Sequence, residues 1–286
     1  MEVAMYPGCT FSGTAREYRE SVETVAQTLG VEFRELQDWT CCGASSAHVL
    51  NDRLAIALPA RDLLIADKTG LDLVTPCAAC FLRLKYAEKY LKQGKPIDGI
   101  SGTLNSDFHV KPLVDYFWED VGEKALTEKV KKPLDALNPV CYYGCLTARP
   151  PKITDSKNPE NPQEMDRLLK SLGANVRNWS FKSDCCGGNL ALTRPDLQMK
   201  LTQKLLDMAE EAGADCIAVS CPMCHLNLDS KQTEISQESG KSYNIPIFYF
   251  SELMGLAFGS SDVATWLSRH HVDGRALLKE KGLLVG

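Results

Sequence analysis

A Cys-Cys-Gly step occurs twice in this chain, each time inside the same larger cysteine pattern. In both copies a cysteine after a glycine comes first, the Cys-Cys-Gly step follows, and a Cys-x-x-Cys pair ends the pattern. In each copy 34 residues lie between the second cysteine of the step and the first cysteine of the pair. A repeat of this kind predicts two copies of one folding unit. We call the two groups the first thiol set, Cys9, Cys41, Cys42, Cys77 and Cys80, and the second thiol set, Cys145, Cys185, Cys186, Cys221 and Cys224.

Net charge and hydropathy limit the binding partners and the cellular location that we expect for this protein. The 286-residue chain has a formal net charge of −5 and no block of like charge, so nucleic-acid binding is not expected. No apolar run approaches the length of a membrane span, and no leader-like segment precedes the first motif. We therefore expect a cytoplasmic protein without a direct membrane span, in which thiols stay reduced. Regularly spaced cysteines in such a protein indicate metal binding or redox chemistry.

Short apolar segments alternate with segments of helical periodicity in both copies, which predicts an α/β fold with mainly parallel sheets. We expect two tandem Rossmann-like domains, residues 1–135 and 136–286, related by a pseudo-twofold axis. Asn51 and Pro195 are expected to begin helices, and Gly30 to end one. The expected strands are 3–6, 31–36, 71–75, 140–143, 175–179, 216–220 and 245–250, and the expected helices include 14–29, 51–68, 80–91, 163–172, 195–212 and 252–258.

Each part of the cysteine pattern lies just after a predicted strand and before a predicted helix. Loops at the carboxyl ends of parallel strands form ligand sites, so three loops can bring one, two and two thiolates together in each half. Thiolates bind zinc, copper(I) or iron–sulfur clusters. Structural zinc and a cubane 4Fe–4S cluster take four ligands, whereas five suit a cluster that needs more; paired zinc sites are the alternative. Cys141 and Cys216 have no counterpart in the other copy, so we expect them to be small core residues.

Other side chains near the thiols are candidates for supporting roles. His48 and His225 are candidate proton donors, with polar packing as the alternative. Arg83, Arg149 and Lys182 flank cysteine loops and are candidates for holding an anionic substrate, with solvated charge as the alternative. The other three histidines are expected on the surface. No Gly-x-Gly-x-x-Gly follows a predicted strand, so neither a flavin nor a nicotinamide cofactor is expected.

The cysteine pattern resembles that of the CCG domain, and two such domains in tandem without other cluster motifs resemble the B-type subunit of heterodisulfide reductase. The resemblance covers residues 6–224. It implies that each domain binds one noncubane 4Fe–4S cluster through the five cysteines of its thiol set. It also implies that a disulfide is reduced between the two clusters, in methanogens the mixed disulfide of coenzyme M and coenzyme B (CoM-S-S-CoB). The implied partners are a ferredoxin-like C-type subunit with cubane 4Fe–4S clusters and a flavin-containing A-type subunit.

The segments 5–10 and 13–18 look more like bacterial or non-methanogen members of this family, which leaves the disulfide open. Related CCG proteins serve in lactate or glycolate oxidation and as subunits of unusual succinate dehydrogenases. One alternative is therefore an electron-relay subunit of such a dehydrogenase complex, or a membrane-anchoring adaptor, with no disulfide substrate of its own. Glycolate-type members usually carry ferredoxin motifs of the form C-x2-C-x2-C-x3-C-P, and this chain has none. A zinc-stabilised binding module is the third alternative.

Overall fold

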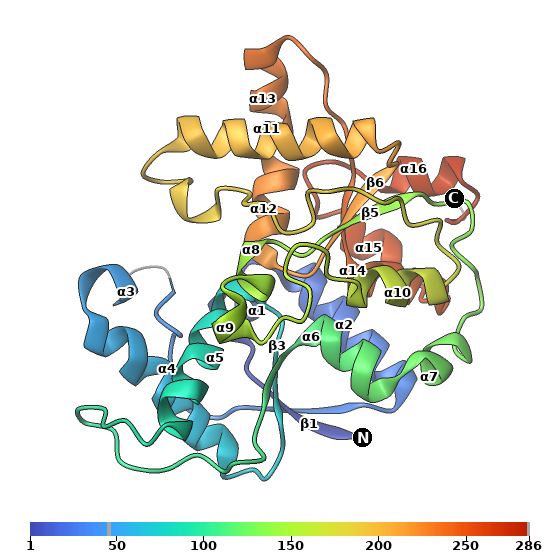
Figure 1. Cartoon of the computed structure of the whole chain (residues 1–286). Helices are drawn as coiled ribbons and strands as arrows, with labels where there is room; N and C mark the ends of the chain where they lie inside the picture. The colour runs from blue at the N-terminus through green and yellow to red at the C-terminus, as the bar shows by residue number, and fades with distance from the viewer. Residues whose placement is uncertain (45–46, 285–286) are drawn as a thin grey trace.

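Two parallel sheets form the centre of the molecule, one in each half of the chain (Figure 1). The computed structural model describes residues 1–44 and 47–284. The strands are β1 (Glu2–Met5), β2 (Glu32–Glu35), β3 (Leu73–Thr75), β4 (Val110–Pro112), β5 (Pro139–Tyr142), β6 (Cys216–Val219) and β7 (Ile247–Tyr249). The first sheet has the order β2-β1-β3-β4 and the second the order β5-β6-β7. All neighbouring strands pair in parallel, which confirms the predicted α/β class.

The predicted strand at 175–179 is not a regular strand in the structure, so this prediction was wrong in detail. The backbone N–H groups of Asn175 and Arg177 donate to the carbonyls of Leu137 and Pro139, at 3.0 and 2.8 Å. The segment therefore runs along β5 in the position that β2 has beside β1. These two bonds join it to β5 without extending into a longer ladder, which is why it does not form a strand. Both halves nevertheless keep the same order of segments.

Helices surround both sheets, and several of their ends follow local sequence signals. The first half contains α1 (Gly8–Ser12), α2 (Arg16–Leu29), α3 (Ala47–Leu50), α4 (Asp52–Asp67), α5 (Ala78–Lys92), α6 (Leu113–Tyr116), the π-helical turn η1 (Phe117–Val121) and α7 (Glu123–Thr127). The second half contains α8 (Cys145–Ala148), α9 (Pro151–Thr154), α10 (Glu164–Ser171), the 3-10 turn η2 (Gly188–Leu190), α11 (Pro195–Glu211), α12 (Pro222–Ser230), α13 (Gln232–Ser239), α14 (Phe250–Ala257), α15 (Val263–Leu267) and α16 (Arg275–Glu280). As predicted, Asn51 caps α4 by accepting from the N–H groups of Arg53 and Leu54, at 2.9 and 3.1 Å. Gly30 ends α2 at φ +66° and Pro195 begins α11, also as predicted.

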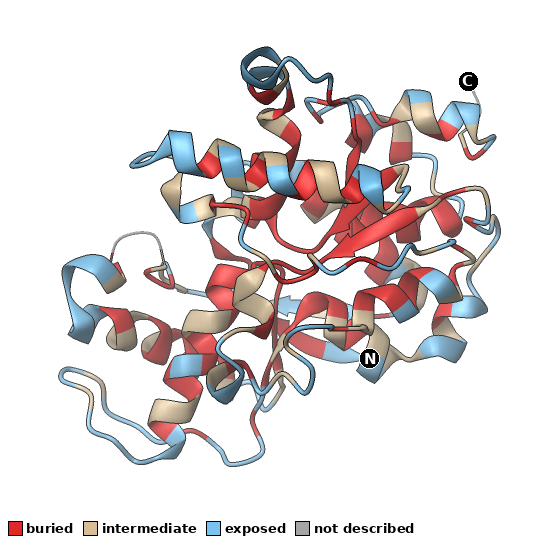
Figure 2. Ribbon diagram, turned by 45° about the horizontal axis from the view of Figure 1, so that its top comes forward, coloured by how far each residue is buried: buried red, intermediate tan, exposed pale blue. Residues whose placement is uncertain are grey.

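Helices of each half pack on helices of the other half, and the two contacts are equivalent, as expected for halves related by a pseudo-twofold axis. The helix after β7, α14, packs on α2 of the first half, while α6 and η1, which follow β4, pack on α10 of the second. Near the first of these contacts the rings of Tyr18 and Tyr249 stack with centroids 4.0 Å apart, and the Tyr18 hydroxyl donates to the carbonyl of Ser220 at 3.0 Å. The hydroxyls of Ser21 and Ser251 are 2.7 Å apart. Figure 2 shows buried residues along the strands and inner helix faces of both halves, which share one core.

The connection between the halves runs from the end of α7 at Thr127 to the start of β5 at Pro139. The predicted boundary between residues 135 and 136 falls in this connection. Since the halves share a core, their separation into two domains stays a prediction. Within the described residues, none of the helices combines the length and apolar character that crossing a bilayer requires.

Candidate metal centres

The first thiol set comes together at the carboxyl ends of strands in the first sheet. Cys9 lies in α1, shortly after β1, and Cys77 is the N-cap residue of α5, shortly after β3. Cys41 and Cys42 follow β2. The Sγ atoms of Cys42 and Cys80 are 3.3 Å apart and both side chains are buried, whereas Cys9 and Cys41 are exposed. This is the edge of a parallel sheet at which ligands bind.

The second thiol set repeats this arrangement. Cys145 begins α8 after β5, and Cys221 is the N-cap residue of α12 after β6. The Sγ atoms of Cys186 and Cys224 are 3.7 Å apart, and both side chains are buried. A hydrogen bond to Cys185, together with burial, raises the pKa of Cys145. The Cys-Cys-Gly steps also match, since the glycine after each pair donates its N–H to the first sulfur of the pair, at 3.4 Å in the first half and 3.3 Å in the second.

A glycine before the first cysteine of each set lets the backbone pass close to the last one. Gly8 has φ +67° and Gly144 has φ +73°. A Cβ atom at Gly8 would lie 3.1 Å from the Sγ of Cys80, and one at Gly144 would lie 3.0 Å from the Sγ of Cys224. Because of the positive φ and the close approach to sulfur, any residue larger than glycine would strain the backbone at these two positions. The loop that carries the first thiol of each set therefore passes beside the last thiol.

The two thiol sets lie near each other where the halves meet, since Ala78 and Ala79, directly after Cys77, line one pocket with Cys221. A hydrogen bond to Cys221 raises the pKa of Cys77 well above its ordinary value. Hydrogen bonds to Cys224 and to Cys77 lower the pKa of Cys221 well below its ordinary value. Both side chains are buried. The two sites are therefore adjacent, with one thiol of each set at the boundary.

The thiols of each set are the donors that an iron–sulfur cluster takes. Among residues 1–44 and 47–284, no three or more cysteine, histidine, aspartate or glutamate side chains are arranged around a position for a single ion. The fit to an iron–sulfur cluster depends instead on the donor type, five soft thiolates from three loops in each half. The close passage of Gly8 over Cys80, and of Gly144 over Cys224, brings the loop of the first thiol beside the last thiol of each set.

A small apolar pocket of about 90 Å³ opens beside the second thiol set. Besides the five cysteines, its described lining includes Ala78 and Ala79 from the first half. Leu146, Leu190 and Met223 complete the apolar part of the wall. Asn189 is the most polar of the non-cysteine lining residues, and none of the described lining residues is charged. A molecule that enters here meets thiols through an uncharged opening.

Two of the three cations predicted near a substrate have other partners. Lys182 is only 1% exposed, and its ammonium donates to Asp166 at 2.7 Å and to the carbonyl of Pro162 at 3.1 Å. Lys182 therefore forms a buried ion pair behind the Cys145 loop. It does not hold a substrate, as its position in the sequence had suggested it could. Arg149 is paired with the carboxylate of Glu160.

Arg83 is the predicted cation that lies beside a thiol. Hydrogen bonds with Cys41 and Cys80 lower the pKa of Cys42 to about 3, and the positive charge of Arg83 contributes to this shift. The side chain lines a pocket of about 520 Å³ that also includes His48. His48 itself is half-buried, with its Nδ1 3.4 Å from the carbonyl of Gly43.

Sequence reasoning missed Asn227, which lies beside the second thiol set. Its amide donates to the Sγ of Cys186 at 3.6 Å and to the Cys186 carbonyl at 3.2 Å. The signal was present in the repeat, because Asn227 stands three residues after Cys224 just as Arg83 stands three residues after Cys80. Residues three apart lie on the same face of a helix.

Two histidines are more buried than a proton donor or a surface residue would be. The ring of His225 stacks on Tyr249 at 4.2 Å, and its Nε2 is 3.1 Å from the carbonyl of Ile247. Burial lowers the pKa of His225 well below its ordinary value, so these contacts favour the packing alternative. His270, expected on the surface, is buried against α14, with its Nε2 3.0 Å from Glu252. The structure confirms Cys141 and Cys216 as fully buried strand residues.

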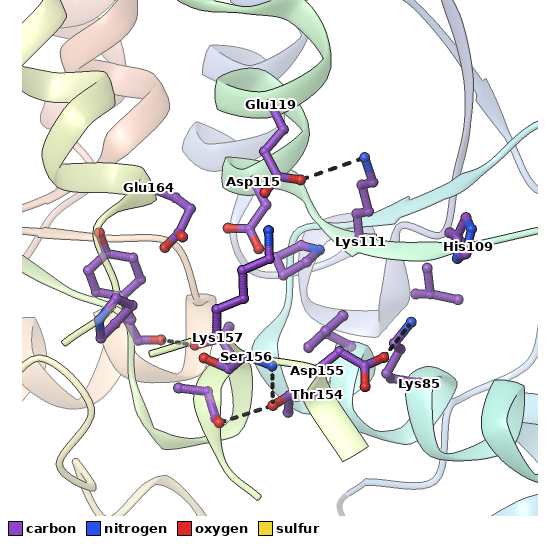
Figure 3. A pocket seen from close by; sticks show the side chains of 17 residues that line it. Lys85, His109, Lys111, Asp115, Glu119, Thr154, Asp155, Ser156, Lys157 and Glu164 are labelled. Carbon is purple, nitrogen blue, oxygen red and sulfur yellow. Dashed lines mark hydrogen bonds and ion pairs between the residues drawn. The ribbon is translucent and has the colours of Figure 1, made fainter. Parts of the chain in front are cut away.

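Another pocket, of about 290 Å³, lies between the halves (Figure 3). None of its described lining residues is a cysteine. Its walls carry charges of both signs, and Lys85 of the first half pairs with Asp155 of the second at 3.4 Å. Lys111 pairs with Glu119 at 3.7 Å. These cations are engaged in ion pairs, and one pair joins the two halves.

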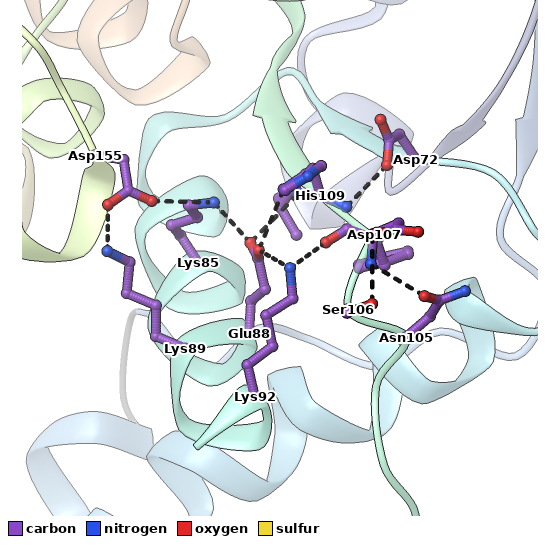
Figure 4. A network of polar contacts seen from close by, with 12 residues as sticks. Asp72, Lys85, Glu88, Lys89, Lys92, Asn105, Ser106, Asp107, His109 and Asp155 are labelled. Carbon is purple, nitrogen blue, oxygen red and sulfur yellow. Dashed lines mark hydrogen bonds and ion pairs between the residues drawn. The ribbon is translucent and has the colours of Figure 1, made fainter. Parts of the chain in front are cut away.

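A buried carboxylate joins α5, the helix that begins at Cys77, to the first sheet (Figure 4). Glu88 is 2% exposed and pairs with Lys85 at 2.9 Å and with Lys92 at 3.0 Å. It also lies 3.4 Å from the backbone N–H of Val110 in β4. The network fixes the helix against the sheet and so positions the thiols at the N-terminal end of the helix.

The matched thiol sets on two parallel sheets define a protein with two cysteine-rich domains in tandem. The chain belongs to the family of the cysteine-rich domain CCG, whose model matches residues 3–85 and 140–229. It is 31% identical over 283 residues to the 8-methylmenaquinol:fumarate reductase membrane anchor subunit of Wolinella succinogenes, over 96% of this chain and 99% of that protein. It is 26% identical over 271 residues to the B-type subunit of the Ferredoxin:CoB-CoM heterodisulfide reductase of Methanosarcina mazei, over 91% of this chain and 90% of that protein.

These relatives confirm the resemblance to the B-type subunit of heterodisulfide reductase and add a fumarate reductase protein to it. They support an electron-transfer role as an oxidoreductase subunit, and the cysteine-rich domains imply iron–sulfur clusters. Among solved structures, a hypothetical protein from Helicobacter pylori has a similar fold, with a TM-score of 0.70 and 11% sequence identity. The similarity covers 95% of this chain and 52% of the Helicobacter chain, about half of its length.

Proposed function

We propose that this protein is the catalytic subunit of a disulfide reductase complex, similar to the B-type subunit of heterodisulfide reductase. Each half, residues 1–135 and 136–286, holds one noncubane 4Fe–4S cluster through the five cysteines of its thiol set. The equivalence of the two sets supports this proposal, down to the glycines at positions 8 and 144. The proposal names the type of iron–sulfur cluster and the cysteines that bind it, which the family alone does not specify.

The proximity of the two thiol sets is the observation that carries the proposed reaction: Ala78 and Ala79, which follow Cys77, line one pocket with Cys221, and Cys77 and Cys221 shift each other's pKa. Reduction of a disulfide breaks the S–S bond, consumes two electrons and two protons, and yields two thiols. Bound clusters supply electrons one at a time, so two adjacent sites provide the pair. The chain itself supplies a pocket at the second set, with Ala78 and Ala79 of the first half in its wall. The half-buried His48 is a closer candidate for delivering protons than the buried His225.

The electrons reach this protein through protein contact in the proposed complex. The partners are a ferredoxin-like C-type subunit with cubane clusters and a flavin-containing A-type subunit. This assignment follows from the relationship to the B-type protein of heterodisulfide reductase, which is named as one subunit of a larger enzyme. We propose a cytoplasmic location on the same grounds.

Anaerobic purification with iron and sulfide analysis tests the cofactor, and we expect about eight irons and eight sulfides per chain. The reduced complex should then be reoxidised by a disulfide. Cys186→Ser should abolish this reoxidation and lower the iron content to about half, because Cys186 belongs to one set only. Cys141→Ser is the matched control, since Cys141 is a buried strand residue outside both sets. Zinc without acid-labile sulfide would contradict the proposal.

A second candidate is an electron-relay subunit of a quinol- or succinate-linked reductase complex, with no disulfide substrate. The relationship to the Wolinella fumarate reductase subunit and the uncharged pocket at the second set favour it. The two candidates differ in one measurement on the same complex. A disulfide should reoxidise the reduced clusters in the first case, whereas only a quinone or fumarate should do so in the second.

A further inference from the structure

The two thiol sets differ at one matched position that lies beside the Cys-Cys-Gly step. Three residues after the last cysteine of each set stands a donor, Arg83 in α5 and Asn227 in α12. The Asn227 amide donates to the Sγ of Cys186 at 3.6 Å. Arg83 stands at the matched position of α5, three residues after Cys80 and on the same face of the helix. One site therefore has a full positive charge where the other has a neutral amide dipole.

The surroundings of the first cysteine of each set also differ, and again the first half is the more polar. Cys9 is exposed, and the residue after it, Thr10, places its hydroxyl 3.8 Å from the Cys9 sulfur. Cys145 is less exposed, and the residue after it, Leu146, lines the apolar pocket. The first site is thus more polar and more open to water than the second.

We propose that these differences set the two cluster sites at different reduction potentials, with the first-half site the higher. The proposal depends on the cluster ligands assigned under the proposed function. Reduction adds a negative charge to a group that already carries thiolates. A nearby cation, hydrogen bonds and water stabilise that charge, and an apolar wall does not. All three differences favour reduction of the first half.

The consequence is an order of electron filling within one chain. An electron that enters the protein settles in the first half, beside Arg83. The second half is reduced only when the donor is strong enough to fill both. Arg83 acts on the potential through the thiolates and is a positioning residue.

A redox titration of the anaerobically purified complex, followed by electron paramagnetic resonance, tests the proposal. Two potentials are expected, and Cys42→Ser assigns one of them to the first half by perturbing its signal. Arg83→Gln should make reduction of the first half at least about tenfold less favourable, a fall of about 59 mV for a one-electron couple. The second-half potential should not move. Arg83→Lys should restore most of the shift, because it restores the charge.

Lys95→Gln is the matched control, since it removes one positive charge from an exposed residue beyond the end of α5. It should leave both potentials unchanged. Asn227→Arg should raise the second-half potential, and it tests the proposal independently if Arg83→Gln loses iron. A second-half potential that is the higher of the two would overturn the proposal. So would unchanged potentials in Arg83→Gln with full iron content. A wild-type protein without iron and sulfide would instead contradict the proposed function.

Discussion

At the scale of single residues, the thiol sites depend on glycines as much as on cysteines. Gly144 has φ +73° and ψ +169°, a conformation that residues with a side chain rarely adopt. Its missing side chain also leaves room for the sulfur of Cys224, which would lie 3.0 Å from a Cβ atom. The same close approach between Gly8 and Cys80 in the other half shows that it belongs to the site and not to one loop.

Gly144→Ala should therefore destabilise the fold by about 1–3 kcal/mol and displace Cys224 from its set. We expect the iron content to fall by about half, with the second-half site lost. Denaturant unfolding and iron analysis of the same preparation measure both effects. Gly213→Ala is the matched control, because Gly213 also has a positive φ, +69°, but a Cβ atom there meets nothing within 4 Å. Full iron content in Gly144→Ala would show that the close approach does not organise the site.

At the scale of elements, α5 carries two thiols of the first set at its N-terminal end and a buried charge network further along. Glu88 is held by Lys85 and Lys92 and contacts the N–H of Val110, so it connects helix and sheet. Removal of one partner from a buried ion pair leaves the other charges without compensation. The network is therefore more sensitive to substitution than the ion pairs at the surface.

Glu88→Ala should lower the free energy of unfolding by about 3 kcal/mol, because Lys92 loses its carboxylate partner and the buried Lys85 keeps only Asp155. Urea unfolding followed by circular dichroism measures this change. Glu128→Ala is the control, since Glu128 is exposed and its contact with Lys124 is 4.0 Å long. We expect it to change stability by no more than about 0.5 kcal/mol. Equal effects of the two substitutions would count against a structural role for the network.

The elements also show which predictions the sequence supports. Asn51, Gly30 and Pro195 were placed correctly because capping and termination depend on neighbouring residues. The segment 175–179 was not, because a strand needs a partner ladder, and only two backbone bonds join this segment to β5.

Burial that arises from distant parts of the chain escaped prediction for the same reason. Lys182 was a candidate for holding a substrate, with solvated charge as the alternative, but it is buried against Asp166 of α10. His270 was expected at the surface, but it is covered by the fold of the last helices against Glu252. Asn227 could have been found by aligning the two copies, since the repeat places it opposite Arg83.

At the scale of the whole molecule, the reciprocal packing of α14 on α2 and of α10 on α6 makes each half part of the other's core. Tyr18 in α2 is fully buried, with Tyr249 and Phe250 of the second half against its ring. The two thiol sets also meet across this boundary. The halves are related as folding units but do not have separate interiors.

Residues 1–135 and 136–286, produced separately, should each lack cooperative unfolding, because each would expose the face that the other covers. Mixed or co-expressed halves should associate and regain it. Thermal unfolding followed by calorimetry distinguishes these states, with the intact chain as the reference. A sharp transition in either isolated half would mean that the halves are autonomous domains.

The packing of α14 on α2 also determines when the first half can finish folding during synthesis of the chain. The apolar face of α2 leaves the ribosome long before α14, which must cover it, has been made. The first half therefore waits for almost the whole chain before its core closes. Under the proposed function, iron and sulfide would be inserted into the first half only after α14 has been made, when the cores of both halves can close.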